Sequence, residues 1–355
     1  MGILTQHRTL GILNALVAAL LFGASAPLAK LLLGEIEPVL LAALLYLGSG
    51  IGLLAVRYVL GNGSSTARRE ARISRSDLPW LAGAILAGGF AAPIVLLFSL
   101  KSTPAATAAL LLNFETAATT VLALLVFREE VGRRALWSVA LVTVSSVLLS
   151  IAPAAAWGLS LGALGILAAC ILWGIDNNLT RNISAKDPVA IVTIKGLAAG
   201  ACSLVLAFAL RTPLPAFGAI LGALVLGGLS YGLSIVMFIR AMRAIGSART
   251  SAWFGASPLA GLILSLVLFR QLPNWLFWLA LVLMAMAAAL LVNEQHEHEH
   301  FHDLLVHDHA HAHDDGHHEH AHQPPLSGGH AHRHRHEQRQ HAHEHLPDIH
   351  HRHDS

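Results

Sequence analysis

The sequence predicts an all-α membrane protein with ten transmembrane helices, arranged as two inverted repeats of five, followed by a disordered His-rich tail. Three observations indicate this fold class. Of the 355 residues, 55% are hydrophobic and only 12% are charged, and the apolar residues fall in long runs. The two halves of the apolar part resemble each other at a nearly constant spacing. The last 60 residues, in contrast, contain 22 of the 23 histidines.

Ten apolar runs are long enough to be membrane spans, because a hydrocarbon core of about 30 Å needs about 20 helical residues. The predicted spans are Leu10–Leu33, Val39–Leu60, Leu78–Leu100, Ala105–Phe127, Ala135–Ile151, Leu159–Asn178, Val189–Leu210, Phe217–Ile239, Ala248–Phe269 and Trp275–Val292. The first run is too long for a cleavable signal sequence and continues as a span. Pro27 is expected to bend or interrupt it. Cys170 and Cys202 fall inside spans and do not indicate a disulfide framework.

Positively charged residues mark the cytoplasmic side of a membrane protein. If the ten runs cross in turn, fourteen Lys and Arg residues fall on the side of the N-terminus, four of them in the loop 61–77. Four fall on the other side, namely Lys30, Lys101, Arg211 and Arg270. This bias predicts a multi-pass protein of the inner (cytoplasmic) membrane with both termini in the cytoplasm.

An internal repeat divides the apolar part into residues 8–152 and 158–293. Leu161-Gly162 through Trp173-Gly174 parallels Leu10-Gly11 through Phe22-Gly23, an offset of 151 residues. The segment from Lys101 to Thr116 aligns without a gap on the segment from Arg243 to Pro258, an offset of 142. Each half contains five spans, and an odd number makes the halves insert in opposite orientations, as in many secondary transporters.

Several segments resemble the EamA branch of the drug/metabolite transporter superfamily. They are Phe98-Ser-Leu-Lys-Ser-Thr-Pro-Ala-Ala-Thr-Ala-Ala, Phe114-Glu-Thr and Val126-Phe-Arg-Glu-Glu, in a chain with two five-span repeats. The resemblance covers about residues 8–293. It implies a ten-helix fold and secondary transport, often export, of metabolites, amino acids or drugs. The family usually has Glu after the fourth and ninth spans, whereas this chain has Glu129 and Glu130 at the first place and Gln271 at the second.

Two charged residues lie inside predicted spans at similar depth. The turn between the sixth and seventh spans centres near Ala185, nine residues after Asp176 and ten before Lys195. At about 1.5 Å of rise per residue, the two side chains reach similar depth in neighbouring antiparallel helices. An isolated charge in hydrocarbon costs about 2.5–3.5 kcal/mol, so a pair or a polar cavity is expected. A structural ion pair and a lining of the substrate path are both consistent with this pattern.

Three more polar side chains complete the predicted substrate path. Glu115 lies near the middle of the fourth span, where a carboxyl group either carries a coupled proton or stays protonated as a structural group. Asn177 and Asn178 adjoin Asp176, and their amides can bind a solute or link helices by hydrogen bonds. The residues of the predicted path are Glu115, Asp176, Asn177, Asn178 and Lys195.

The tail, residues 294–355, is predicted to bind metal ions. It has few apolar residues, so it is expected to be disordered without a ligand. Neutral imidazole is a good ligand for Ni, Co and Zn ions, and the interleaved carboxylates can support it. The predicted metal-ligating residues are His296, His298, His300, His302, His307, His309, His311, His313, His317, His318, His320 and His322.

Three functions fit this combination of body and tail. The body exports a divalent metal ion that the tail collects, or it exports a metabolite or amino acid under regulation by metal through the tail. In the third interpretation, the chain is a membrane-tethered metal sensor or store that does not transport. The spans contain no His, which counts against direct metal transport.

Several other classes are not expected. The chain has no Gly-x-x-x-x-Gly-Lys-Ser/Thr sequence for ATP-driven transport, and neither an enzyme activity nor a required cofactor is predicted. A net charge of +2 is too small to indicate nucleic acid as a partner. The expected partners are the lipid bilayer, a small solute or metal ion and, as the alternative to a monomer, a second copy in a homodimer.

Overall fold

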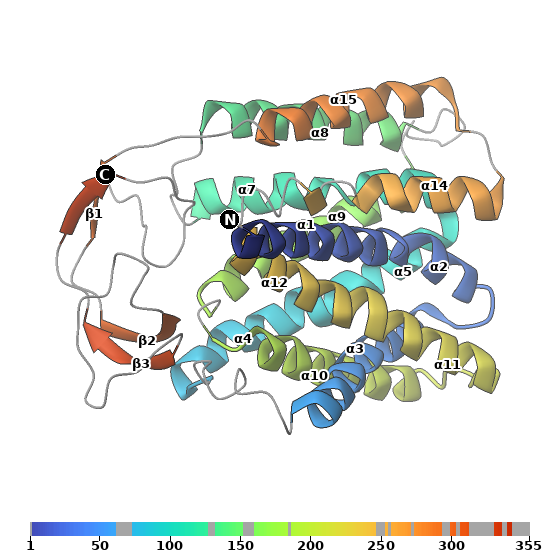
Figure 1. The fold of residues 1–355 in the computed structure, drawn as a ribbon. Helices are drawn as coiled ribbons and strands as arrows, with labels where there is room; N and C mark the ends of the chain where they lie inside the picture. The colour runs from blue at the N-terminus through green and yellow to red at the C-terminus, as the bar shows by residue number, and fades with distance from the viewer. Residues whose placement is uncertain are drawn as a thin grey trace.

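The computed structural model describes residues 2–61, 73–126, 132–151, 160–183, 186–245, 253–254, 257–270 and 273–292 of the body, and 299–302, 306–311, 330–335 and 339–342 of the tail. The body is a bundle of helices stacked in layers (Figure 1). Its first half contains α1 (Gly2–Gly23), α2 (Ser25–Leu32), α3 (Pro38–Gly61), η2 (Arg75–Asp77), α4 (Leu78–Ala84), η3 (Ile85–Ala91), α5 (Ala92–Ser102), α6 (Ala105–Leu111), α7 (Phe114–Val126) and α8 (Arg133–Ser150). The second half contains α9 (Leu161–Arg181), α10 (Pro188–Ala209), α11 (Phe217–Leu226), η4 (Gly227–Leu233), α12 (Ser234–Ile245), α14 (Ser257–Phe269) and α15 (Trp275–Val292).

Within the described residues, seven helical segments are long and apolar enough to cross a membrane, as expected of a multi-pass membrane protein. They are Thr9–Leu32, Pro38–Tyr58, Arg75–Ser102, Ala105–Val126, Leu161–Arg181, Pro188–Ala209 and Phe217–Ala241. The other three predicted spans coincide with shorter apolar helices, which are Leu136–Ser150, Ser257–Phe269 and Trp275–Leu290. The start of the predicted ninth span is only partly described, because residues 248–252 and 255–256 lie outside the described ranges.

The first and fourth spans are interrupted helices. The first breaks at Ala24, between α1 and α2, as Pro27 predicts, because proline has no N–H for the Gly23 carbonyl four residues earlier. The fourth breaks at residues 112–113, between α6 and α7, and Glu115 lies in the first turn of α7. The break therefore falls next to a carboxyl group at mid-span.

The third and eighth spans each contain a π-helix, in which one extra residue widens a turn. These are η3, Ile85–Ala91, and η4, Gly227–Leu233. Their first residues are 142 positions apart, the same offset that relates Lys101 to Arg243.

Glycines allow α3, α10 and η4 to pack backbone against backbone. A Cβ atom at Gly196 of α10 would lie 2.8 Å from the amide nitrogen of Gly50 in α3, and one at Gly227 of η4 would overlap the carbonyl of Leu45. Small residues at such contacts are the usual means of close helix packing in membranes. These contacts hold η4 and α10 on either side of α3.

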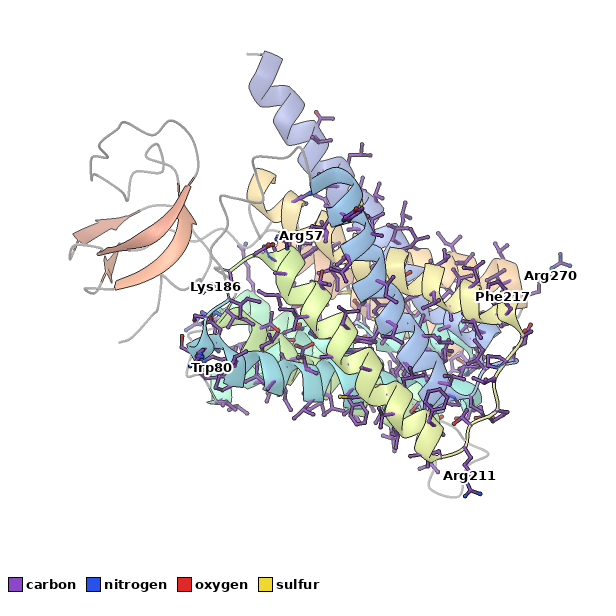
Figure 2. All side chains as sticks on the ribbon, turned by 90° about the horizontal axis from the view of Figure 1, so that it is seen from below. Arg57, Trp80, Lys186, Arg211, Phe217 and Arg270 are labelled. Carbon is purple, nitrogen blue, oxygen red and sulfur yellow. The ribbon has the colours of Figure 1, made fainter. Side chains whose placement is uncertain are left out.

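The two ends of the bundle carry the two groups of charges that the sequence separates. Arg57 and Lys186, with Trp80, lie at one end, and Arg211 and Arg270 lie at the other (Figure 2). These four basic residues therefore lie at the ends of the bundle to which the charge count assigns them.

The described tail segments form strands, whereas disorder was expected. β1 (Glu299–His302) pairs with β4 (Arg339–Ala342), and β2 (Val306–His311) pairs with β3 (His330–Arg335), both antiparallel. The physical reason lies in the alternating sequence, since every second residue of a strand shares a face. In the β2–β3 ladder, His307, His309 and His311 are in register with His334, His332 and His330.

Candidate functional site

Asp176 and Lys195 form the predicted ion pair. The Nζ atom of Lys195 donates to Oδ2 of Asp176, and Thr180 Oγ1 donates to Oδ1 at 3.0 Å. Asp176 is only 3% exposed, so its charge depends on these two partners. Equal depth, argued from the helical rise, permitted this contact, and the rotation of α9 and α10 brings the two side chains together.

The pair lies over η3. Both α9 and α10 pack against η3. A Cβ atom at Gly88 would overlap the carboxylate of Asp176, and one at Gly89 would lie 3.7 Å from Cγ of Lys195. Gly88 therefore leaves the space that the Asp176 carboxylate occupies, whereas the tight contact at Gly89 is with Ala199 of α10.

The main-chain carbonyl of Gly88 accepts two side-chain hydrogen bonds. The Tyr46 hydroxyl of α3 donates to it at 2.7 Å, and the Trp173 Nε1 atom of α9 donates at 2.9 Å. Both bonds are buried. They connect α3 and α9 to the same peptide group of η3.

Glu115 and Asn177 form a second polar contact in the same region. The Asn177 amide lies 2.9 Å from Glu115 Oε1 and 3.1 Å from Thr119 Oγ1, so it links α9 to α7. Asn177 directly follows Asp176 on α9, so this contact adjoins the charged pair along the helix. Asn177 is exposed and Glu115 half-buried, so this contact lines an accessible surface. Four of the five predicted path residues, Glu115, Asn177, Asp176 and Lys195, therefore lie in the same region of the bundle.

Asn178 points to a different contact. Its amide donates to the Thr119 carbonyl at 3.1 Å and to the Gly174 carbonyl at 2.8 Å. The side chain is buried and joins α9 to α7. The sequence left open whether this amide binds a solute or links helices, and here it links helices. Asn177 is the asparagine that contacts Glu115.

An aromatic cluster adjoins the site on the side of α1 and η4. The ring centroids of Tyr46 and Tyr231 are 5.7 Å apart, and those of Phe22 and Tyr231 are 6.2 Å apart. Phe254 contacts Phe22 at 5.5 Å and Phe238 at 4.8 Å. The cluster therefore extends from the Gly88 carbonyl to α12.

Two ion pairs join separate elements at the Arg57 end of the bundle (Figure 2). Arg57 lies 3.2 Å from Asp187, and Lys186 lies 3.9 Å from Asp77. Asp187 also caps α10, since its Oδ1 atom accepts from the amides of Val189 and Ala190. These pairs connect α3 and η2 to the start of α10.

The predicted metal ligands are only partly described. His300, His302, His307, His309 and His311 lie in β1 and β2, whereas the remaining seven lie outside the described residues. Within the described part of the chain, no three or more His, Cys, Asp or Glu residues gather as they would around a metal ion. Metal binding by the tail therefore stays a prediction.

Sequence reasoning missed the side chains around the charged pair and the Glu115–Asn177 contact, namely Tyr46, Thr119, Trp173 and Thr180. The consecutive Gly88 and Gly89 were a usable signal for close packing. Nothing in the sequence indicated which helices they would face.

Comparison with known proteins identifies the family. The model of the EamA-like transporter family matches the chain twice, over residues 9–151 and 160–293. The chain belongs to the EamA-like transporter family. A similar protein is an uncharacterized transporter of Methanothermobacter thermautotrophicus, 29% identical over 279 residues, or 75% of this chain and 81% of the relative. A solved crystal structure superposes with a TM-score of 0.57 at 22% identity over 79% of this chain and 94% of the other, which shows a shared fold.

Proposed function

We propose that this EamA-like protein is a secondary transporter that exports a small solute across the cytoplasmic membrane. The observation that carries the proposal is the polar site formed by Glu115, Asn177, Asp176 and Lys195 inside apolar helices. Ionisable groups inside a membrane are costly, and those that persist usually mark a path for a solute or ion. Glu115 and Asn177 are the members that a solute reaches first, because they are less buried than Asp176.

The architecture we propose is an inverted repeat of five helices and five helices, with both termini in the cytoplasm. The double match to the family model and the common offset of η3 and η4 support the repeat. The division of the Lys and Arg residues in the sequence, fourteen on the side of the N-terminus and four on the other, supports the orientation.

The solute we propose is a divalent metal ion such as Ni, Co or Zn, which the tail collects on the cytoplasmic side. The 22 histidines in the last 60 residues support this choice. A second candidate is export of a metabolite or amino acid under metal regulation through the tail. The absence of His from the spans favours that candidate.

Cells lacking the gene will accumulate Ni, Co or Zn under stress by that metal, and the wild-type gene will restore the lower content. Elemental analysis of washed cells and profiling of released metabolites make the measurement. A gene encoding the Asp176→Asn/Lys195→Met variant is the matched control, because it retains the tail but alters the path. Unchanged metal content with altered metabolite release would favour the second candidate. No difference in either would contradict transport and leave a metal sensor or store.

A further inference from the structure

Pro93 leaves the Gly88 carbonyl without a main-chain donor. In η3, the Ala92 amide donates to the Ala87 carbonyl five residues earlier. The next bond in this pattern would run from residue 93 to Gly88, but proline has no N–H. A buried carbonyl needs a partner, and this one obtains two from other helices, the Tyr46 hydroxyl and the Trp173 indole. Both lone pairs of the oxygen are therefore used.

The same peptide group lies against the charged pair. Trp173 and Asp176 are three residues apart on α9, so they lie on neighbouring parts of one helix face. The indole bond holds this face on η3 at the place where Gly88 has no side chain. The Asp176 carboxylate fills that space and meets Lys195 from α10.

The second π-helix provides an internal comparison. In η4, the Ser234 amide donates to the Leu229 carbonyl, which repeats the Ala92–Ala87 bond after 142 residues. The residue that corresponds to Pro93 is Ile235, which has its N–H. The two π-helices therefore share a backbone pattern, but at the corresponding position Pro93 lacks the N–H group that Ile235 has.

We propose that Pro93 and Gly88 are positioning residues of the transport site. Pro93 keeps the Gly88 carbonyl available to Tyr46 and Trp173, and Gly88 gives Asp176 the room to reach Lys195. The importance of this arrangement for transport rests on the proposed function of the pair, whereas the arrangement itself is tested without any solute.

The test is Pro93→Ala in a protein whose only tryptophan is Trp173, the other six being replaced by Phe. Alanine supplies an N–H at position 93, and a carbonyl with two lone pairs cannot keep three strong donors. Ultraviolet resonance Raman spectra of the purified protein report hydrogen bonding of Trp173 and, by difference with Tyr46→Phe, of Tyr46. We expect the band of at least one donor to shift to its weakly bonded position. Ile235→Ala, the matched change in η4, is expected to leave both bands unchanged.

Competition for the carbonyl predicts a specific rescue. In Tyr46→Phe, one lone pair is free, so adding Pro93→Ala is expected to leave the Trp173 band unchanged. The role of Pro93 is overturned if Pro93→Ala alone shifts neither band. It is also overturned if the Trp173 band shifts as far in Tyr46→Phe/Pro93→Ala as in Pro93→Ala alone. Since the spectra need no solute, this result is independent of whether the protein transports a metal.

Gly88→Ala tests the space beside Asp176. The added methyl group would overlap the carboxylate, so we expect a large loss of protein from the membrane fraction. Gly218→Ala is the matched helical control, because nothing lies within 4 Å of a Cβ atom there. The background Asp176→Gly/Lys195→Met removes the obstructing carboxylate together with the Cβ atom of residue 176, which the new methyl group would also overlap, and Gly88→Ala is expected to be tolerated in it. Equal abundance of Gly88→Ala and Gly218→Ala would overturn the role of Gly88.

Discussion

Asp176→Asn or Lys195→Met alone will lower the amount of protein in the membrane severalfold. Each change leaves one charge without its partner in a site where Asp176 is 3% exposed. Removing one member of a buried pair typically destabilises a protein by about 3–5 kcal/mol. Since the Lys195 side chain is 18% exposed, the effect of leaving Lys195 unpaired is expected at the lower end of that range. Quantitative blots of membrane fractions make the measurement.

The double variant Asp176→Asn/Lys195→Met is expected to recover abundance, because it leaves neither charge uncompensated. Arg57→Gln is the matched control for losing an ion pair. Its side chain is 45% exposed, and exposed pairs contribute only about 0–1 kcal/mol. If the path interpretation holds, the recovered double variant is abundant but does not release the solute. Singles as abundant as wild type would show that the pair contributes nothing to the fold.

The full-length protein will bind several Ni, Co or Zn ions, and a variant truncated after Asn293 will lose this binding while staying in the membrane. The tail supplies 22 imidazoles, and metal binding requires each ligand to be neutral. Because free imidazole has a pKa of about 6.5, protons compete increasingly below that pH, and the affinity is expected to fall steeply. Titration calorimetry of both proteins above and below this pH measures the effect.

Binding that does not change with pH would contradict ligation by imidazole. Loss of the truncated protein from the membrane would contradict the division between body and tail. An equal metal content in the full-length and truncated proteins would place the ions in the body.

Depth along a helix could be predicted from the sequence, whereas helix rotation could not. The rise per residue placed Asp176 and Lys195 at one level, and the structure pairs them. The Glu115–Asn177 contact joins residues that are 62 positions apart, and no spacing rule relates the faces of two such helices. For the same reason, the sequence did not show that the Asn178 amide donates to the Thr119 carbonyl on α7.

The apolar runs predicted the helices because each run is continuous and long. Their internal irregularities were less predictable. Pro27 indicated the break at Ala24, but the sequence did not indicate which side chains bind the Gly88 carbonyl of η3, because they lie on α3 and α9. In the tail, low apolar content favoured disorder, while alternation of His with other residues also suits the paired strands of the structure.

Asn177→Cys tests most directly whether the polar site lines a path. In a protein with Cys170 and Cys202 replaced by Ala, a charged, water-soluble thiol reagent is applied to membrane vesicles of both orientations. Val205→Cys is the control, since Val205 is 69% exposed on α10 and belongs to an apolar surface expected to face lipid. We predict rapid labelling of Cys at position 177 and none at position 205. No labelling at position 177 from either side of the membrane would contradict a solute path through Glu115, Asn177, Asp176 and Lys195.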